Sequence, residues 1–259
     1  MQSVNCILEK VGNTPHISIP SFFDKNKKLI LKLENKNPSG TIKDRLAKMI
    51  INNNLNQDIF VIDSGIWDFA VSLSWFTSFL GKKTIIIIRD DTDIKFIDRV
   101  HRYGASIIFS NVKKQEDLNI IAKEYAMKHN YFYCGYPNGI EYQDNIAKEI
   151  YKEISNLNFN SLVSYYGSGA TIDALRKIVP KKIPIIMASL DIREKVADRE
   201  GLKYYDTNEI EVQEVQNYLL QKCAIPAGIL GATSATIAMK LLEENIIENP
   251  LVLMSDTQM

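Results

Sequence analysis

The stretch NPSGTIKDR, Asn37–Arg45, carries one lysine, Lys43, directly after a Pro-Ser-Gly turn and a Thr-Ile step. An apolar helical pattern begins at this lysine. Most lysine side chains lie on solvated faces of proteins, whereas this one would stand at the mouth of a helix. The sequence therefore marks Lys43 as the first candidate for a chemical role.

Outward from this stretch, short β-branched runs alternate with helical patterns along the chain. We expect strands at 29–35, 58–65, 82–90, 105–110, 131–135, 183–190 and 250–256, helices at 43–55, 67–81, 93–104, 115–130, 145–155, 209–225 and 232–246, and a strand, a glycine turn and a helix within 161–179. Near-continuous apolar strands that alternate with helices are typical of parallel sheets covered on both faces. The pattern predicts an α/β fold.

The composition excludes several classes of partner. The 259 residues are 46% hydrophobic and carry a formal net charge of zero, which gives no basis for binding nucleic acid or an anionic membrane. The longest apolar runs have the length of strands and are too short to span a bilayer, and the N-terminus lacks the pattern of a secretory signal. The three cysteines and three histidines are scattered, which predicts reduced thiols in a cytosolic protein and no metal site.

Two further turns carry groups that could bind a ligand. In GSGAT, Gly167–Thr171, small residues follow an apolar strand and precede a helix, so backbone N–H groups and two hydroxyls could hold a phosphate. Because glycine-rich turns are common, the motif alone favours an ordinary tight connection over a phosphate site. GATSAT, Gly231–Thr236, places the hydroxyls of Thr233 and Ser234 at another helix start, where N-capping alone would account for them.

An amine, a phosphate cradle and a neutral hydroxyl together suit pyridoxal 5'-phosphate. This cofactor needs an amine for its aldehyde, donors for its phosphate and a partner for its ring nitrogen. A hydroxyl partner would leave that nitrogen largely unprotonated, which suits β-elimination better than transamination.

The chain resembles the cysteine synthase and cystathionine β-synthase group of fold type II pyridoxal phosphate enzymes, which share the tryptophan synthase β-like fold. The family's motifs occur here in order: VGNTP at 11–15, NPSGTIKDR at 37–45, DSGIWD at 63–68, GSGAT at 167–171 and GATSAT at 231–236. The resemblance implies that Lys43 carries the cofactor and removes the substrate's α-proton. It assigns the phosphate to Gly167, Ser168, Gly169 and Thr171, and the ring nitrogen to Thr233, with Ser234 as the alternative.

The substrate side departs from the family's pattern. The family's loop reads Thr/Ser-Ser-Gly-Asn-Thr/Phe-Gly, and here it is DSGIWD, with Ile66 in place of the asparagine. The resemblance assigns substrate binding to Asp63, Ser64, Gly65 and Trp67. A carboxylate about 4 Å from a substrate carboxylate would cost on the order of 4 kcal/mol, about a thousandfold in affinity, unless Asp63 or Asp68 is protonated or turned away.

Two further departures concern residues that would close around the substrate. Gly135 stands where the family has a glutamine that holds the substrate carboxylate. The segment between GSGAT and GATSAT is shorter than in the family and lacks the stretch that normally closes over the active site.

The resemblance implies two domains, each a mostly parallel twisted sheet flanked by helices: a smaller one over 34–136, and a larger one made of 1–33 plus 137–259, with the cofactor between them. The expected activity is β-replacement or β-elimination on a serine-like or cysteine-like amino acid, in a cytoplasmic homodimer. One alternative is a degenerate member that acts as a binding or regulatory subunit, with Trp67 and Phe69 filling the old substrate site. Another is a threonine dehydratase-like deaminase.

Overall fold

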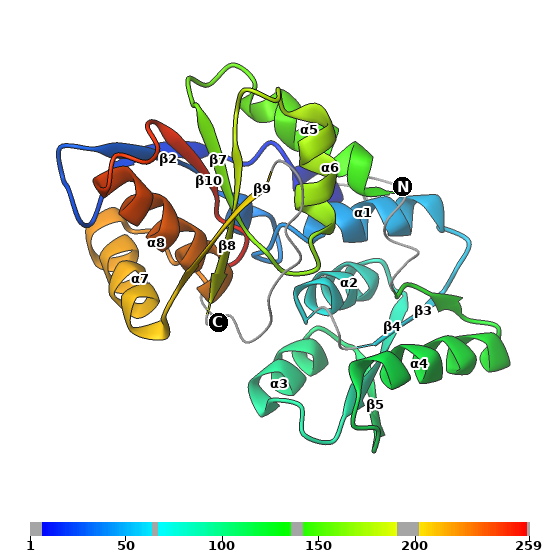
Figure 1. Ribbon diagram of the computed structural model, residues 1–259. Coiled ribbons are helices and arrows are strands. Elements are labelled where there is room, and N and C mark those ends of the chain that lie inside the picture. Colours follow the sequence, from blue (N-terminus) through cyan, green and yellow to red (C-terminus); the bar gives the residue numbers. More distant parts are fainter. Residues whose placement is uncertain (1–6, 64–66, 136–141, 191–201, 258–259) are drawn as a thin grey trace. The chain divides into compact units, whose positions relative to one another are not determined.

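The computed structural model describes residues 7–63, 67–135, 142–190 and 202–257 (Figure 1). The chain divides into two compact units, which are described separately below. Unit 1 comprises Met1–Val11 and Lys43–Gln143, and unit 2 comprises Gly12–Ile42 and Asp144–Met259. The domain limits expected from the sequence stay a prediction.

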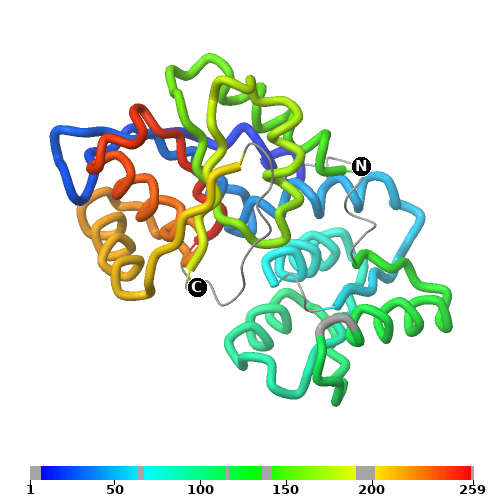
Figure 2. The backbone as a smooth tube through the Cα atoms, in the orientation of Figure 1, coloured from blue at the N-terminus to red at the C-terminus, as the bar shows by residue number. Residues whose placement is uncertain are grey.

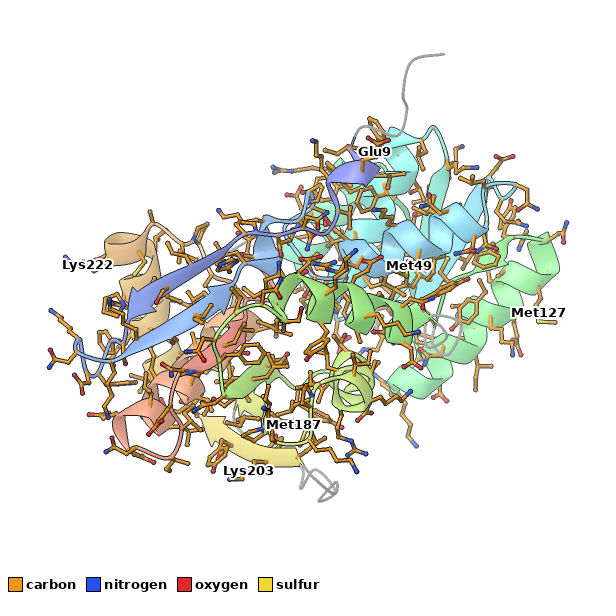
Figure 3. The ribbon with its side chains drawn as sticks, turned by 90° about the horizontal axis from the view of Figure 1, so that it is seen from above. Glu9, Met49, Met127, Met187, Lys203 and Lys222 are labelled. Carbon is orange, nitrogen blue, oxygen red and sulfur yellow. The ribbon has the colours of Figure 1, made fainter. Side chains whose placement is uncertain are left out.

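Unit 1 contains a four-stranded parallel sheet in the order β5-β4-β3-β6. Its strands are β3 (Ile59–Asp63), β4 (Lys83–Arg89), β5 (Ser106–Ser110) and β6 (Phe132–Tyr133), and its helices are α1 (Asp44–Asn53), α2 (Trp67–Phe79), α3 (Ile94–Arg102) and α4 (Gln115–His129). The isoleucine run of β4 is largely buried in this sheet, and α4 packs Leu118, Ala122 and Ala126 against Val61 and Ile87. On the outer side of α4, Met127 is exposed (Figure 3).

Unit 2 contains a six-stranded sheet in the order β1-β2-β10-β7-β8-β9, in which only the pair β1 and β2 is antiparallel among the described strands. Its strands are β1 (His16–Pro20), β2 (Lys28–Lys32), β7 (Ser161–Tyr165), β8 (Ile185–Leu190), β9 (Leu202–Thr207) and β10 (Pro250–Leu253), and its helices are α5 (Gln143–Ile154), α6 (Ala170–Ile178), α7 (Glu209–Cys223) and α8 (Ile229–Glu243). Helices α7 and α8 lie together on one side of the sheet (Figure 1). Helix α8 is apolar almost all round because it packs between α7 and the sheet.

The α/β class and the mostly parallel sheets confirm the fold expected from the sequence. Two strands were not predicted. Strand β1 forms a hairpin with β2 through a turn in which Ser21 N donates to Lys27 O at 2.8 Å. Strand β9 is an edge strand in which only the first and last residues are buried, and it lacks the apolar run that identified its neighbours.

The ends of several helices follow the sequence signals. Gly81 and Gly104 follow α2 and α3 with φ of 69° and 80°, the left-handed conformation that ends helices at glycine. Helix α8 starts at Ile229, three residues before the expected start at 232. This early start moves the GATSAT hydroxyls away from the helix end, with consequences for the site.

Candidate functional site

The loop that leads to Lys43 is held by a buried carboxylate. Glu34 is fully buried directly after β2, and its two oxygens accept hydrogen bonds from Thr14 Oγ1 at 2.7 Å and Asn37 Nδ2 at 2.9 Å. Gly12 N donates to Asn37 Oδ1 at 2.9 Å. The VGNTP motif therefore stabilises the NPSG turn, because Gly12 N and the Thr14 hydroxyl donate to the side chains of Asn37 and Glu34.

The same loop is joined to the C-terminal end of the described chain. Ile42 N donates to Ser255 O at 2.8 Å, and Thr257 N donates to Gly40 O at 2.9 Å. Thr41 and Asp256 form an antiparallel bridge between these two bonds. Gly40 has φ of 91°, a conformation that L side chains rarely adopt. The glycine of the NPSG turn is thus required by the backbone.

Lys43 occupies the N-cap position of α1, and its carbonyl oxygen accepts from Ala47 N at 2.9 Å. Burial lowers the pKa of the Lys43 amine, and the negative charge of Asp68 acts in the opposite direction. Burial likewise raises the pKa of Asp68, against the charges of Lys43 and Arg99. The shift favours the neutral amine, which is the nucleophilic and basic form of lysine.

A buried hydrogen bond joins the helix that starts at Lys43 to α2, which carries Asp68. Ser72 Oγ donates to Asp44 Oδ1 at 2.6 Å and also lies 3.0 Å from Asp68 O, one turn earlier in its own helix. Asp44 and Ser72 are fully buried. This pair was not predicted from the sequence, in which Ser72 is one of several hydroxyl-bearing residues of α2.

The first residue of the expected substrate loop, Asp63, ends β3 and is 5% exposed. Tyr133 Oη donates to Asp63 Oδ2 at 3.3 Å. Burial and the neighbouring Asp63 raise the pKa of Tyr133. A Cβ atom at Gly135 would lie 2.0 Å from Tyr133 Oη, so the tyrosine occupies the space that a side chain at position 135 would need. The expected substrate residues Ser64 and Gly65, and Ile66, lie outside the described residues.

Trp67 opens α2 and is 40% exposed. Its ring stacks on Phe96 of α3, with centroids 4.9 Å apart and planes at 27°. Phe69 is 2% exposed and belongs to the core of unit 1. Of the two aromatic residues considered as fillers of a substrate site, Phe69 is therefore a packing residue, whereas Trp67 retains an exposed face.

The GSGAT turn has the strand-turn-helix arrangement expected for a phosphate cradle. Gly167 and Ser168 are exposed between β7 and α6, and Gly169 is the N-cap of α6 with φ of 77°. A Cβ at Gly169 would come within 2.9 Å of the Tyr166 ring. Thr171 lies in the first turn of α6. An exposed hydroxyl and the positive end of a helix suit an anion.

The expected ring-nitrogen residue, Thr233, lies in the second turn of α8. The expectation that GATSAT starts a helix was wrong, because α8 begins at Ile229. Thr233 is fully buried and donates to Ile229 O at 2.7 Å, and Ser234 donates to Leu230 O at 3.1 Å. Both hydroxyls satisfy carbonyl groups of their own helix.

A carboxylate that the sequence analysis missed stands at the start of α8. Asp256 accepts from Leu230 N at 3.2 Å and from Gly231 N at 2.7 Å. Its carbonyl oxygen accepts from Gly228 N at 3.0 Å. The available signal was an aspartate three residues beyond the last apolar strand, β10 (Pro250–Leu253).

Within the described parts of the chain, no three His, Cys, Asp or Glu residues are grouped so that they could hold a metal ion. In the same parts, no helix combines the length and the apolar character needed to cross a bilayer.

Comparison with known proteins agrees with this arrangement. The family model described as pyridoxal-phosphate dependent enzyme matches residues 7–188, more than half of the chain. A cysteine synthase of Flavobacterium sp. is 25% identical over 188 residues, covering 68% of this chain and 61% of that protein. O-ureido-L-serine synthase of Streptomyces lavendulae is 20% identical over 189 residues, covering 69% of this chain and 58% of that protein. The matches thus span about three fifths of the length of these relatives.

Solved structures share the fold over almost the whole chain. O-ureido-L-serine synthase superposes with a TM-score of 0.81 at 19% identity, covering 98% of this chain and 92% of the other. A hydrogen sulfide-producing enzyme from Fusobacterium nucleatum superposes with a TM-score of 0.79 at 19% identity, covering 100% and 98%. These are fold type II enzymes with the tryptophan synthase β-like fold. The match of the family model over residues 7–188 shows that this chain belongs to the family of pyridoxal-phosphate dependent enzymes.

Proposed function

We propose that this chain is a cysteine synthase-like enzyme that catalyses β-replacement or β-elimination on a serine-like or cysteine-like amino acid. The observation that carries the proposal is the Lys43 amine, which stands at the start of α1 with a pKa lowered by burial. Relatives named cysteine synthase and O-ureido-L-serine synthase support this reaction class.

The residues present fit pyridoxal phosphate. The turn at Gly169 needs a glycine both for its φ of 77° and for the space beside Tyr166, and it leaves Gly167 and Ser168 exposed at the positive end of α6. Lys43 supplies an amine shifted toward its neutral form. When bound, the cofactor supplies an aldehyde for that amine and a ring that withdraws electrons from the substrate's α-carbon.

In this proposal the Lys43 amine would hold the cofactor through its aldehyde. As a free amine, Lys43 would take the proton from the substrate's α-carbon, which a lysine with a lowered pKa can do near neutral pH. Gly167, Ser168, Gly169 and Thr171 orient the phosphate. In a β-replacement, a thiol, sulfide or amine would take the place of the leaving group on the substrate's β-carbon.

On the substrate side, the proposal keeps Asp63, Ser64, Gly65 and Trp67 as contact residues. Tyr133 donates a hydrogen bond to the Asp63 carboxylate. In this proposal the bond holds the Asp63 carboxylate toward the tyrosine. Tyr133 then takes the space beside Gly135, where the family has its carboxylate-binding glutamine. We therefore expect a substrate preference that differs from that of cysteine synthases. A cytoplasmic homodimer is proposed from family analogy.

Absorbance spectroscopy of the purified protein tests the proposal. Incubation with pyridoxal phosphate should give a visible band that Lys43→Ala abolishes. Lys48→Ala is the matched control, because Lys48 lies on the same helix and contacts Val11 O at 3.4 Å. No band in the wild type, or a band unchanged in Lys43→Ala, would overturn the proposal. Adding O-acetylserine, serine or cysteine should shift the band.

A second candidate is a degenerate member that binds without catalysis. The observation in its favour is the altered substrate side, where Tyr133 closes the space at Gly135 and Trp67 stacks on Phe96. Two results together would favour this second candidate. The protein would show a Lys43-dependent absorbance band that none of the three amino acids shifts, and it would co-purify with a catalytic homologue.

A further inference from the structure

Asp68 lies on the face of α2 that meets the start of α1. Asp68 and Ser72 are four residues apart, so their side chains lie on the same face of the helix. Ser72 Oγ donates to Asp44 Oδ1 at 2.6 Å, and Asp44 is the first residue of α1, directly after Lys43. Within unit 1, α2 lies against α1 (Figure 2). Asp68 is therefore on the side of α2 that faces the position of Lys43.

The same turn of α2 also packs against α3. The Trp67 ring stacks on Phe96, with centroids 4.9 Å apart. Arg99 comes three residues after Phe96 and so lies on the same face of α3. The charge of Arg99 acts on the Asp68 carboxylate, and both residues are half-buried. Asp68 thus stands between two cationic side chains, Lys43 from α1 and Arg99 from α3.

The carboxylate links the two cations electrostatically. Burial lowers the pKa of Lys43, and the charge of Asp68 raises it. Burial raises the pKa of Asp68, and the charges of Lys43 and Arg99 lower it. The other charged residues at the start of α1 are Asp44 and Arg45, which are fully buried. Arginine keeps its charge at physiological pH, so Arg99 favours the ionised form of Asp68 even when the Lys43 amine is neutral.

We infer that Asp68 is a positioning residue for Lys43: its carboxylate stabilises the ammonium that Lys43 becomes on taking the substrate's α-proton. The inference rests on the proposed function. In this step the C–H bond breaks, its electron pair stays with the substrate, and the proton moves to Lys43 Nζ. A carboxylate held beside a base stabilises the protonated base, as the aspartate does for histidine in a Ser-His-Asp triad. Arg99 opposes transfer of that proton onward to Asp68.

This arrangement also bears on the acidic substrate side. From the sequence, Asp68 is expected to repel an amino acid's carboxylate unless it is protonated or turned away. In the structure, the charges of Lys43 and Arg99 oppose that of Asp68. When Lys43 is neutral, Asp68 and Arg99 together carry no net charge. The acid can therefore serve the lysine without excluding an amino acid.

The first test measures the pKa of the Lys43 amine in the cofactor-free protein, and so does not depend on turnover. Lys43 is half-buried, and its rate of labelling by acetic anhydride is followed against pH by mass spectrometry. The rate has an inflection at the pKa of the amine. Asp68→Asn should move this inflection down by about one pH unit, about tenfold in rate below it, because the charge that raises this pKa is lost.

Two variants and an internal reference separate this effect from a general loss of structure. Asp68→Glu keeps the charge and should keep the inflection. Asp98→Asn removes the same charge from α3, where Asp98 pairs with Arg102 at 2.8 Å, and should leave the inflection unchanged. Lys48 lies on the same helix as Lys43 and is labelled in the same samples. Loss of folding would change the labelling of both lysines, whereas loss of the Asp68 charge should change that of Lys43.

The second test measures the strength of the base in the cofactor-loaded protein. The rate of α-proton loss is followed by NMR in deuterium oxide, with whichever of O-acetylserine, serine or cysteine shifts the absorbance band. At a pH above both inflections, the amine is neutral in the wild type and in Asp68→Asn. The loss should then be several-fold slower in Asp68→Asn, because its Lys43 is the weaker base.

An inflection in Asp68→Asn that equals or exceeds that of the wild type would overturn the inference. Loss of the α-proton that is as fast as in the wild type, or faster, would overturn it too. In either case, a Lys43-dependent band leaves the proposed function standing. If the inflection shifts as expected but no band forms with pyridoxal phosphate, the proposed function fails, and Asp68 pairs with Lys43 without taking part in a reaction.

Discussion

Ser72 Oγ on α2 and Asp44 Oδ1 on α1 lie 2.6 Å apart in the interior of unit 1. Both residues are fully buried, so the hydroxyl is a neutral partner to a carboxylate that directly follows Lys43. Through this bond, the first turn of α1 is tied to the helix that carries Asp68. Both helices belong to unit 1, so this bond links the segments that carry Lys43 and Asp68 within one unit.

Ser72→Ala should destabilise the protein by about 1–3 kcal/mol, because it removes a donor from a buried carboxylate. Ser74→Ala is the matched control on the same helix, since the Ser74 hydroxyl donates to Ala70 O at 2.6 Å within α2. Urea denaturation would give both values. If Ser72→Ala and Ser74→Ala lowered the free energy of unfolding equally, the bond to Asp44 would contribute no more than a hydrogen bond within one helix.

The lowered pKa of Lys43 predicts a pH dependence of stability. Between the pKa of Lys43 in the folded protein and the ordinary lysine pKa of 10.5, the unfolded chain binds more protons at this lysine than the folded protein does. The free energy of unfolding should therefore rise with pH through that window, by about 1.4 kcal/mol for each pKa unit of the shift. Lys43→Met should remove this rise.

The measurement is denaturant unfolding of the cofactor-free protein at a series of pH values from neutral to alkaline. The two tryptophans of the chain, Trp67 and Trp75, both lie on α2, so their fluorescence reports on unit 1. If the free energies of unfolding of the wild type and of Lys43→Met changed in parallel with pH, the prediction would be wrong. The control is Lys48→Met, at a half-buried lysine of the same helix, and this variant should follow the wild type.

Gly135→Ala should destabilise the protein by about 1–3 kcal/mol, because the new Cβ would overlap the Tyr133 hydroxyl. The overlap predicts coupling, so the double variant Gly135→Ala with Tyr133→Ala should lose less than the sum of the single losses. Gly81→Ala serves as the control. The φ of 69° at Gly81 is unfavourable for alanine, but a Cβ there would meet open space. Tyr133→Ala should therefore not reduce the stability that Gly81→Ala loses.

Gly169→Ala should weaken binding of pyridoxal phosphate by about tenfold, because alanine is strained at φ of 77° and its Cβ would meet the Tyr166 ring. Pyridoxal, which lacks the phosphate, provides the comparison within the same variant. Fluorescence titrations should show a much smaller change for pyridoxal. An equal loss for both ligands would mean that the turn at 167–171 does not hold the phosphate.

The α/β class, most of the strands and helices, and the family's motifs around Lys43 and Gly169 could be predicted from the order of the amino acids. These features are local: apolar runs, helix-stopping glycines and turn residues are read from neighbours in the chain. Strand β9 was missed because an edge strand needs no continuous apolar run, and the start of α8 was misplaced because its first turn is capped by Asp256, 26 residues from Leu230.

Only the tertiary structure showed how distant residues act together. Glu34 is bound by Thr14 and Asn37, Asp44 by Ser72, and Asp63 by Tyr133. Apart from Glu34 and Asn37, which are three residues apart, these partners come from separate parts of the chain and meet only when its strands and helices pack together. The position of Asp256 follows from the order of strands β2, β10 and β7, which is a property of the assembled sheet and of hydrogen bonds formed across it.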